Sequence, residues 1–179
     1  MRRFAVALAL LLAVAAVTPG SGGSRTSKSA FAVSVEPTIS AASNGLTLKT
    51  DLDGTFNVAN KAASGGGSYS LRAGTTVADE GKFTLTRLVA FQFYGCGEVT
   101  TPDGRITLPP NLCGGRALFA VHATSSTGEQ SDGLYEVNCQ IHDPGGQAPP
   151  GTSEGVKVNA RGVNFHRHVT GDNIFIMLP

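Results

Sequence analysis

The stretch 83-FTLTRLVAFQFYGC-96 decides the fold class. Its apolar side chains fall on alternate positions, which are Phe83, Leu85, Val89, Phe91 and Phe93. Polar or small residues occupy most positions between them, and this alternation is typical of a β-strand with one buried face. Arg87 interrupts the apolar parity, and Leu88 falls on the opposite face. We therefore expect one long strand that either bends near its middle or shows both faces to other parts of the protein there.

The same alternation recurs along the chain between turn signals. Segments of this kind include 31–35, 69–73, 117–123, 134–141, 156–160 and 174–178. Between the N-terminal apolar run and Phe83, no stretch repeats apolar residues at the 3.6-residue spacing of a helix. We count roughly eight to ten short strands, the number that a two-sheet sandwich needs. The predicted fold class is all-β, a single-domain antiparallel β-sandwich of immunoglobulin-like or jelly-roll-like type.

Turn-forming residues divide the predicted strands. The segment 46–58 is predicted as two short strands around a turn at Asp51-Leu52-Asp53-Gly54, because Asp-Gly pairs favour turns. The run Ser64-Gly65-Gly66-Gly67-Ser68 is predicted as a loop from its composition. The parity of the apolar residues changes across Gly162, which predicts a bulge in one strand.

The N-terminus has the pattern of a secretory signal peptide. Arg2 and Arg3 precede an uninterrupted apolar run from Phe4 to Val17, which is shorter than the ~20 residues of a membrane-spanning helix. We predict a signal peptide over residues 1–20 that is cleaved on export, and no membrane span after cleavage. Residues 21–30 are nearly all Gly, Ser, Thr and basic residues, and they are predicted as a flexible leader. The sandwich domain is predicted over residues 31–179.

Composition limits the core and the class of partner. The chain has 179 residues, which suits one compact domain, and its nine phenylalanines must supply much of the core because tryptophan is absent. The formal net charge is +1, and two of the positive residues lie in the predicted signal peptide. We expect no nucleic-acid partner, because no basic patch remains.

Three cysteines in an exported chain allow one disulfide and leave one thiol. Cys96 and Cys113 lie just outside the two arms of a predicted hairpin whose turn is residues 101–104. Closing this hairpin brings the two backbones together, which favours the pair Cys96 and Cys113 and leaves Cys139 as a buried thiol. The alternative pair, Cys96 with Cys139, would join two sheets as in immunoglobulin-like domains.

The segment 133-GLYEVNCQIH-142 and the Pro/Gly-rich loop after it resemble the ligand loop of plastocyanin-like cupredoxins. In that family a cysteine at the end of a strand and a histidine shortly after it bind copper, because thiolate and imidazole suit this metal. The resemblance implies that Cys139 and His142 are copper ligands and that Gln147 is a weak axial ligand. The family also takes a histidine from an earlier strand, and the only histidine before Cys139 is His122.

Two further groups of ligand-type residues are weaker candidates for a metal site. His166 and His168 share one strand face, and they need a third ligand to hold a divalent ion. Asp51 and Asp53 stand at alternate positions, but the other oxygen ligands of a calcium loop are missing. A plain Asp-Gly turn is therefore preferred there.

The chain carries no short catalytic motif of the common hydrolases or nucleotide-binding enzymes. It has no Gly-x-Ser-x-Gly elbow, no HExxH helix and no phosphate-binding loop, and we predict that it is not an enzyme. The predicted function is a secreted structural, adhesion or binding module whose partner is an extracellular protein, a glycan or a second copy. The strand 31–35, predicted to end at Glu36-Pro37, could pair with the exposed edge of a neighbouring molecule. The alternative function is that of a small cupredoxin-like copper protein.

Overall fold

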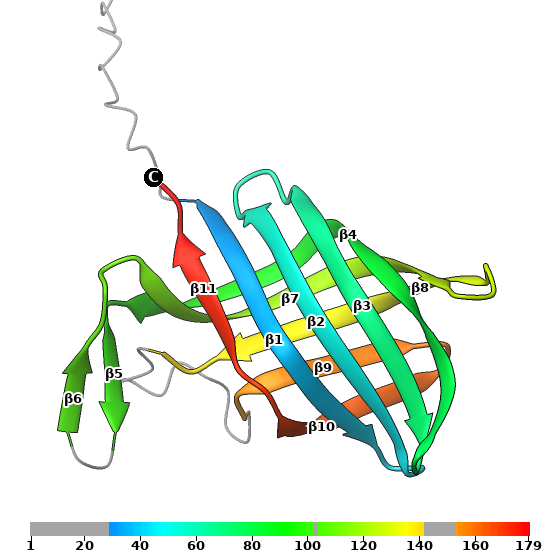
Figure 1. The fold of residues 1–179 in the computed structure, drawn as a ribbon. Coiled ribbons are helices and arrows are strands. Elements are labelled where there is room, and N and C mark those ends of the chain that lie inside the picture. Colours follow the sequence, from blue (N-terminus) through cyan, green and yellow to red (C-terminus); the bar gives the residue numbers. More distant parts are fainter. Residues whose placement is uncertain (1–28, 102–103, 142–152) are drawn as a thin grey trace, which may run out of the picture.

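The computed structural model of the chain describes residues 29–101, 104–141 and 153–179 (Figure 1). This part of the chain consists of strands, turns and loops, and it contains no helix. The strands are β1 (Ala30–Ala42), β2 (Leu46–Asn57), β3 (Ala63–Ala73), β4 (Thr76–Cys96), β5 (Glu98–Thr101), β6 (Gly104–Thr107), β7 (Leu112–Ser125), β8 (Gln130–Cys139), β9 (Gly155–Ala160), β10 (Val163–Thr170) and β11 (Asn173–Met177). The predicted all-β fold class is confirmed.

The predicted signal peptide, residues 1–20, lies outside the described residues, as does the predicted leader up to residue 28. The first strand, β1, begins at Ala30, one residue before the predicted start of the domain. Within the described ranges, no helix has the length and apolar character needed to cross a membrane.

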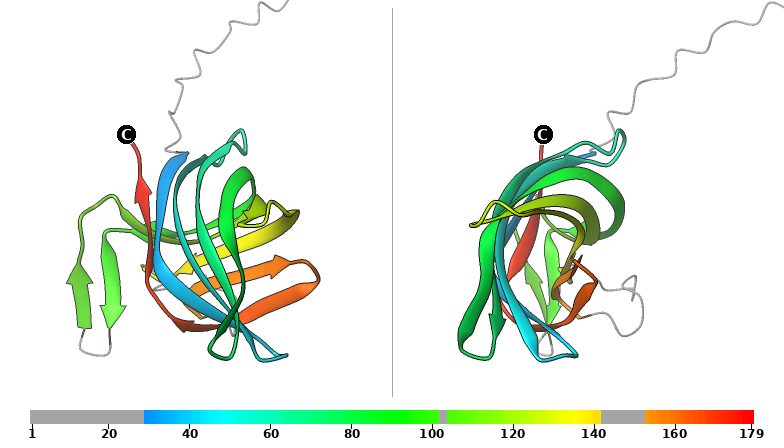
Figure 2. Two further views of the ribbon diagram at one scale, coloured as in Figure 1. Left: turned by 45° about the vertical axis from the view of Figure 1, so that its right-hand side comes forward. Right: turned by 90° about the vertical axis from the view of Figure 1, so that its right-hand side faces the viewer.

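Nine of the strands form one antiparallel sheet that closes on itself. Around the ring the order is β1, β2, β3, β4, β7, β8, β9 and β10, and β10 then pairs with β1 again. Figure 2 shows these strands curving around a common interior. The two layers predicted from the alternation are the opposite walls of this sheet, and they enclose a single core.

The two ends of the closed sheet differ in the number of strands around them. At one end β11 lies between β1 and β7, where Phe175 pairs with both Val33 and Cys113. Because β11 takes the place of β8, β9 and β10 there, six strands surround this narrow end. At the other end β10 pairs with β1, and eight strands surround the interior. The width of a closed sheet grows with its strand number, so this wide end encloses more space.

Phenylalanine rings fill the narrow end. They belong to Phe31, Phe56, Phe91, Phe93, Phe119 and Phe175. Phe56 is central, because its ring centroid lies 5.0 to 5.8 Å from those of four of the others. Tilted and edge contacts of this kind each contribute roughly 0.5–1.5 kcal/mol beyond the burial of apolar area. The narrow end is therefore a packed aromatic core.

Strand β4 follows the expected alternation only in its first half. Phe83 and Leu85 are buried, and a register shift between Leu85 and Arg87 then turns Leu88 inward, where it is 0% exposed. Leu88 turns inward because one extra residue in a bulged strand moves the following side chains to the other face. Two more shifts follow before Cys96. The expected bend is present and consists of these bulges.

Strand β2 runs straight through the segment predicted as an Asp-Gly turn. Asp53 accepts a hydrogen bond from the hydroxyl of Ser34 on β1, at 2.8 Å. Asp51 accepts one from the backbone N–H of Ser68 on β3, at 2.9 Å, and another from the Ser68 hydroxyl. The turn prediction is wrong because both carboxylates bond to neighbouring strands across the sheet.

Strand β3 includes the glycine run that composition predicted as a loop. The backbones of β2 and β4 approach it closely on both sides. A Cβ atom on Gly66 would overlap the carbonyl oxygen of Phe83, and one on Gly67 would overlap that of Asp51. The loop prediction is wrong because these glycines serve close backbone approach within a strand.

Strand β1 has neighbours on both sides along most of its length. Phe31–Val35 pairs with β2 and β11, and Ile39–Ala42 pairs with β10, with β2 alongside as far as Ala41. The strand passes Glu36-Pro37 through a register shift and does not end there. The segment 31–35 is paired on both sides, and pairing with another chain there would require β2 or β11 to leave.

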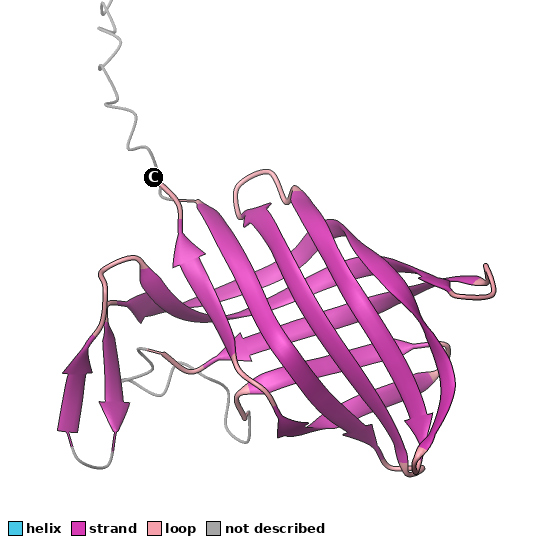
Figure 3. Cartoon of the chain, in the orientation of Figure 1, coloured by secondary structure: helices cyan, strands magenta, loops and turns pink. Residues whose placement is uncertain are grey.

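Strands β5 and β6 form a separate hairpin that projects from the closed sheet (Figure 3). The two central residues of its predicted turn, 102 and 103, lie outside the described residues. At the base of the hairpin, Cys96 of β4 and Cys113 of β7 are paired and joined by a disulfide with an S–S distance of 2.04 Å. This is the pair that hairpin closure favours, and Cys139 is a buried free thiol.

We expect Phe56→Ala to lower the free energy of unfolding by about 3–5 kcal/mol, because it leaves a cavity at the centre of the aromatic core. Phe93→Ala is the matched control, since Phe93 is 44% exposed at the margin of the same cluster. Its expected loss is below about 1.5 kcal/mol. Urea unfolding followed by circular dichroism measures both losses. Equal losses would contradict the central place of Phe56.

Candidate functional site

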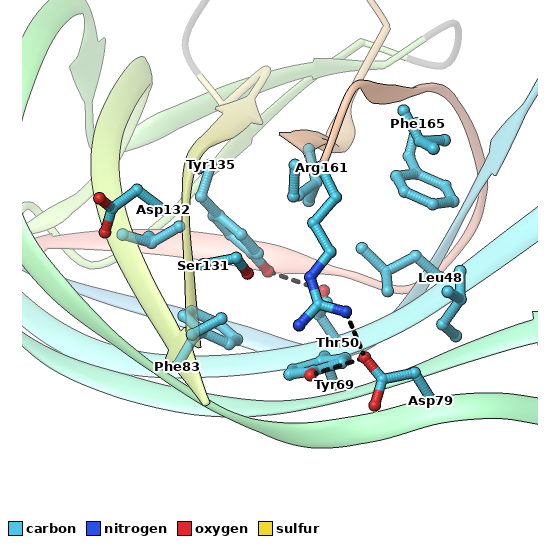
Figure 4. A pocket seen from close by; sticks show the side chains of 17 residues that line it. Leu48, Thr50, Tyr69, Asp79, Phe83, Ser131, Asp132, Tyr135, Arg161 and Phe165 are labelled. Carbon is cyan, nitrogen blue, oxygen red and sulfur yellow. Dashed lines mark hydrogen bonds and ion pairs between the residues drawn. The ribbon is translucent and has the colours of Figure 1, made fainter. Parts of the chain in front are cut away.

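A pocket opens into the wide end of the closed sheet (Figure 4). Its volume is about 100 Å³, and side chains from seven of the eight ring strands line it. The apolar lining includes Leu48, Leu71, Val121, Val158, Val163 and Phe165. An apolar cavity of roughly 150 Å³ stays free of water and admits benzene. The pocket therefore suits a small apolar group.

Thr50 and Tyr135 form the polar part of the buried base of the pocket. Their hydroxyl oxygens lie 2.8 Å apart, and the two residues are 3% and 1% exposed. The ring of Tyr135 stacks on Phe83 at a centroid distance of 5.1 Å. Because Thr50 comes from β2 and Tyr135 from β8, the hydrogen bond joins opposite walls of the sheet. It satisfies two buried hydroxyls that would otherwise each cost about 1–3 kcal/mol.

Polar and charged side chains cross the open end of the pocket. The Tyr69 hydroxyl donates to Asp79 at 3.0 Å. Arg161 Nη1 lies 3.4 Å from the same Asp79 oxygen and 3.3 Å from a Glu129 oxygen. Figure 4 shows Arg161 reaching across the pocket toward Tyr69 and Asp79. These contacts, which we call the rim, link the β9–β10 turn to β3, to β4 and to the turn before β8.

Arg161 and Gly162 form a two-residue turn between β9 and β10. Their φ angles are 50° and 75°, and the flanking residues Ala160 and Val163 pair across the hairpin. Two positive φ values give the turn a twist that matches the strands, which is easy for Gly162. Arg161 adopts the same conformation at a cost of about 1–2 kcal/mol. The prediction of a bulge at Gly162 is wrong, because the parity changes between two strands and not within one.

The phenols of the pocket are neutral at neutral pH. Burial raises the pKa of Tyr69 to about 12, and the hydrogen bond to Asp79 contributes to the increase. Burial also raises the pKa of Tyr135 well above its ordinary value of 10.0, although the hydrogen bond with Thr50 acts in the opposite direction. Tyr69 commits its proton to Asp79, so the rim holds a fixed phenol beside a carboxylate.

The structure separates the two predicted copper ligands that it describes. Cys139 faces the core at 0% exposure, and burial raises the pKa of its thiol to about 12, whereas a metal ligand must be a thiolate. His122 lies outside the core and bonds to Asp132 at 2.8 Å. Cys139 pairs with Gly115 on β7, seven residues before His122, which is about 23 Å along a strand. Cys139 and His122 therefore do not share a metal ion.

Among the described residues, the remaining predicted ligands form no metal site. His142 and Gln147 lie outside the described residues. His166 is exposed, with a ring nitrogen 3.1 Å from the carbonyl oxygen of Asn164. Over the described ranges, no three His, Cys, Asp or Glu side chains gather as a metal site requires.

Sequence reasoning missed the residues of the pocket. Tyr69 and Asp79 lie on the paired strands β3 and β4, whereas Arg161 lies in the β9–β10 turn, and Arg161 meets the other two only because the sheet closes. Alternation places side chains inward or outward but does not say which strands face each other. One local signal was present, because an Arg-Gly pair between two alternating runs fits a two-residue hairpin turn.

Comparison with known proteins provides no relative from which a function can be carried over. No protein-family model matches the chain, and no curated protein or solved structure matches it significantly. The function must therefore be argued from the geometry of the pocket and its rim.

We expect Tyr69 to ionise near pH 12 and the free energy of unfolding to fall between pH 10 and about 12. In this range the unfolded chain has lost the phenolic proton while the folded chain still binds it, so rising pH favours unfolding. Ultraviolet difference titration of the wild type against Tyr69→Phe isolates this phenol. In Asp79→Asn its pKa should fall but stay above 10, because burial remains. An ordinary pKa in the wild type would contradict the observed rim.

Proposed function

We propose that the protein is a secreted, non-enzymatic binding module that takes one small, mainly apolar molecule into the wide end of its closed sheet. The observation that carries this proposal is the pocket of about 100 Å³, which has a buried apolar base and a polar, open rim. Small-molecule sites commonly combine an apolar lining with a few placed polar groups. Closed sheets of eight strands are wide enough to hold one small ligand.

The rigidity of the pocket wall supports this proposal. The Thr50–Tyr135 hydrogen bond and the Phe83–Tyr135 stack fix the base from three strands. The packed aromatic core of the narrow end lies beyond the base and keeps it from collapsing. A site that is already formed loses little conformational freedom when a ligand binds, so more of the contact energy contributes to affinity.

We also propose that the protein is exported from the cell. Export is supported by the apolar run from Phe4 to Val17, which has the pattern of a signal peptide. The disulfide between Cys96 and Cys113 also favours an oxidising compartment. The ligand would then be met outside the cell.

Titration with toluene tests the pocket, because this probe has an apolar body and no polar group. We expect a dissociation constant on the order of 10⁻⁴ to 10⁻³ M. The amide NMR shifts of pocket residues such as Ala123 and Val158 should change, while those of β5 and β6 should not. Shifts confined to other parts of the chain, or none at millimolar toluene, would overturn the proposal.

Filling the pocket supplies the matched variants. Ala123 lines the pocket, and Ala123→Phe should abolish toluene binding because the new ring occupies the space. Ala160→Leu is a milder filling variant for use if Ala123→Phe does not fold. Ala62→Phe, at an exposed position outside the pocket, should bind toluene like the wild type. Unchanged binding in a folded filling variant would contradict the assignment of the pocket.

A further inference from the structure

The charges around the pocket bear on the kind of ligand that it accepts. Asp79, Asp132 and Arg161 line the pocket, and Glu129 lies beside Arg161. Two carboxylates, those of Asp79 and Glu129, therefore pair with one guanidinium, and the open end carries an excess of negative charge. His122 bonds to Asp132, whose side chain is 88% exposed, so this carboxylate points to solvent.

Arg161 keeps hydrogen-bond donors that are directed to no described residue. Both of its ion pairs, with Asp79 and with Glu129, use Nη1. Nε and Nη2 have no bonding partner among residues 29–101, 104–141 and 153–179. Figure 4 shows the guanidinium between Asp79 on one side and Ser131 and Phe83 on the other. An N–H group at this place can donate to an oxygen atom of a bound molecule.

We propose that the pocket selects uncharged ligands with a hydrogen-bond acceptor, such as an amide, ketone or ester oxygen, and discriminates against carboxylates. The inference rests on the proposed function. The apolar body of the ligand fills the base, and its oxygen accepts a hydrogen bond from Arg161. A carboxylate would gain the same hydrogen bond but would meet the charges of Asp79 and Glu129 at close range. A cation would lose hydration in an apolar base and would face the guanidinium.

Three isosteric probes separate these cases. Benzamide, benzoate and benzamidinium share one ring and one planar substituent, and they are neutral, negative and positive at pH 7. We expect benzamide to bind at least about tenfold more tightly than either ion, because each ion loses hydration in an apolar pocket whose guanidinium is already paired with two carboxylates. Isothermal titration calorimetry at fixed ionic strength measures all three.

Two variants test the role of the rim charges. Glu129→Gln removes one carboxylate outside the pocket lining, and it should strengthen benzoate binding about threefold or more while benzamide binding changes less than twofold. Arg161→Asn removes the donors, and asparagine tolerates the positive φ at this turn. It should weaken benzamide binding about fivefold to tenfold, which is more than it weakens the binding of toluene, a probe without an acceptor.

The failures of the two proposals are distinguishable. If benzoate or benzamidinium binds as tightly as benzamide, or if Arg161→Asn keeps full benzamide affinity, the selection for neutral acceptors is overturned. Toluene binding that is lost in Ala123→Phe would still support the apolar pocket in that case. If toluene does not bind to the wild type, the proposed function itself fails.

Discussion

β4 and β7 are paired along most of their length, from Gly81 with Ser125 to Cys96 with Cys113. Together with the pairing of β1 and β10, this contact converts a curved sheet into a closed one. Closure satisfies the backbone groups that would otherwise remain free at two edges, so the ring strands expose little template for another chain. In each ring strand, the alternation of apolar side chains therefore marks the side that faces the same enclosed interior.

The taper of that interior explains why one end is solid and the other hollow. Where β11 reduces the ring to six strands, large aromatic side chains such as Phe56 and Phe119 fill the space. Where eight strands surround the interior, the lining includes small residues, among them Ala123, Gly133 and Ala160. Protein interiors normally pack to the density of organic crystals, so more width and smaller side chains together leave a void. The buried hydroxyls of Thr50 and Tyr135 bond to each other, which limits the cost of placing them in this interior.

Local sequence patterns predicted what depends on neighbours in the chain. Most of the strands, the projecting hairpin and the pair Cys96 and Cys113 follow from spacing over fewer than twenty residues. The copper interpretation depends on a local motif, which does not say whether Cys139 and His122 lie close together. The alternation of β7 already places His122 opposite to Phe119 and Val121, so it and the inward Cys139 lie on different sides of the wall. The closure and the pocket were not predictable, because they depend on pairings such as Ala42 with Phe165 that no local pattern encodes.

The position of Arg161 is difficult to explain by stability alone. The left-handed backbone conformation costs Arg161 about 1–2 kcal/mol. Glycine at this position would not incur the cost, and asparagine would incur less of it. The ion pair of Arg161 with Glu129 contributes only about 0–1 kcal/mol, since the two side chains are 40% and 71% exposed. The pair with Asp79, whose side chain is 19% exposed, uses the same Nη1 at 3.4 Å. The gain from these contacts and the backbone cost nearly cancel. A guanidinium held over an apolar pocket at no net gain in stability is better explained by a contact with what enters the pocket.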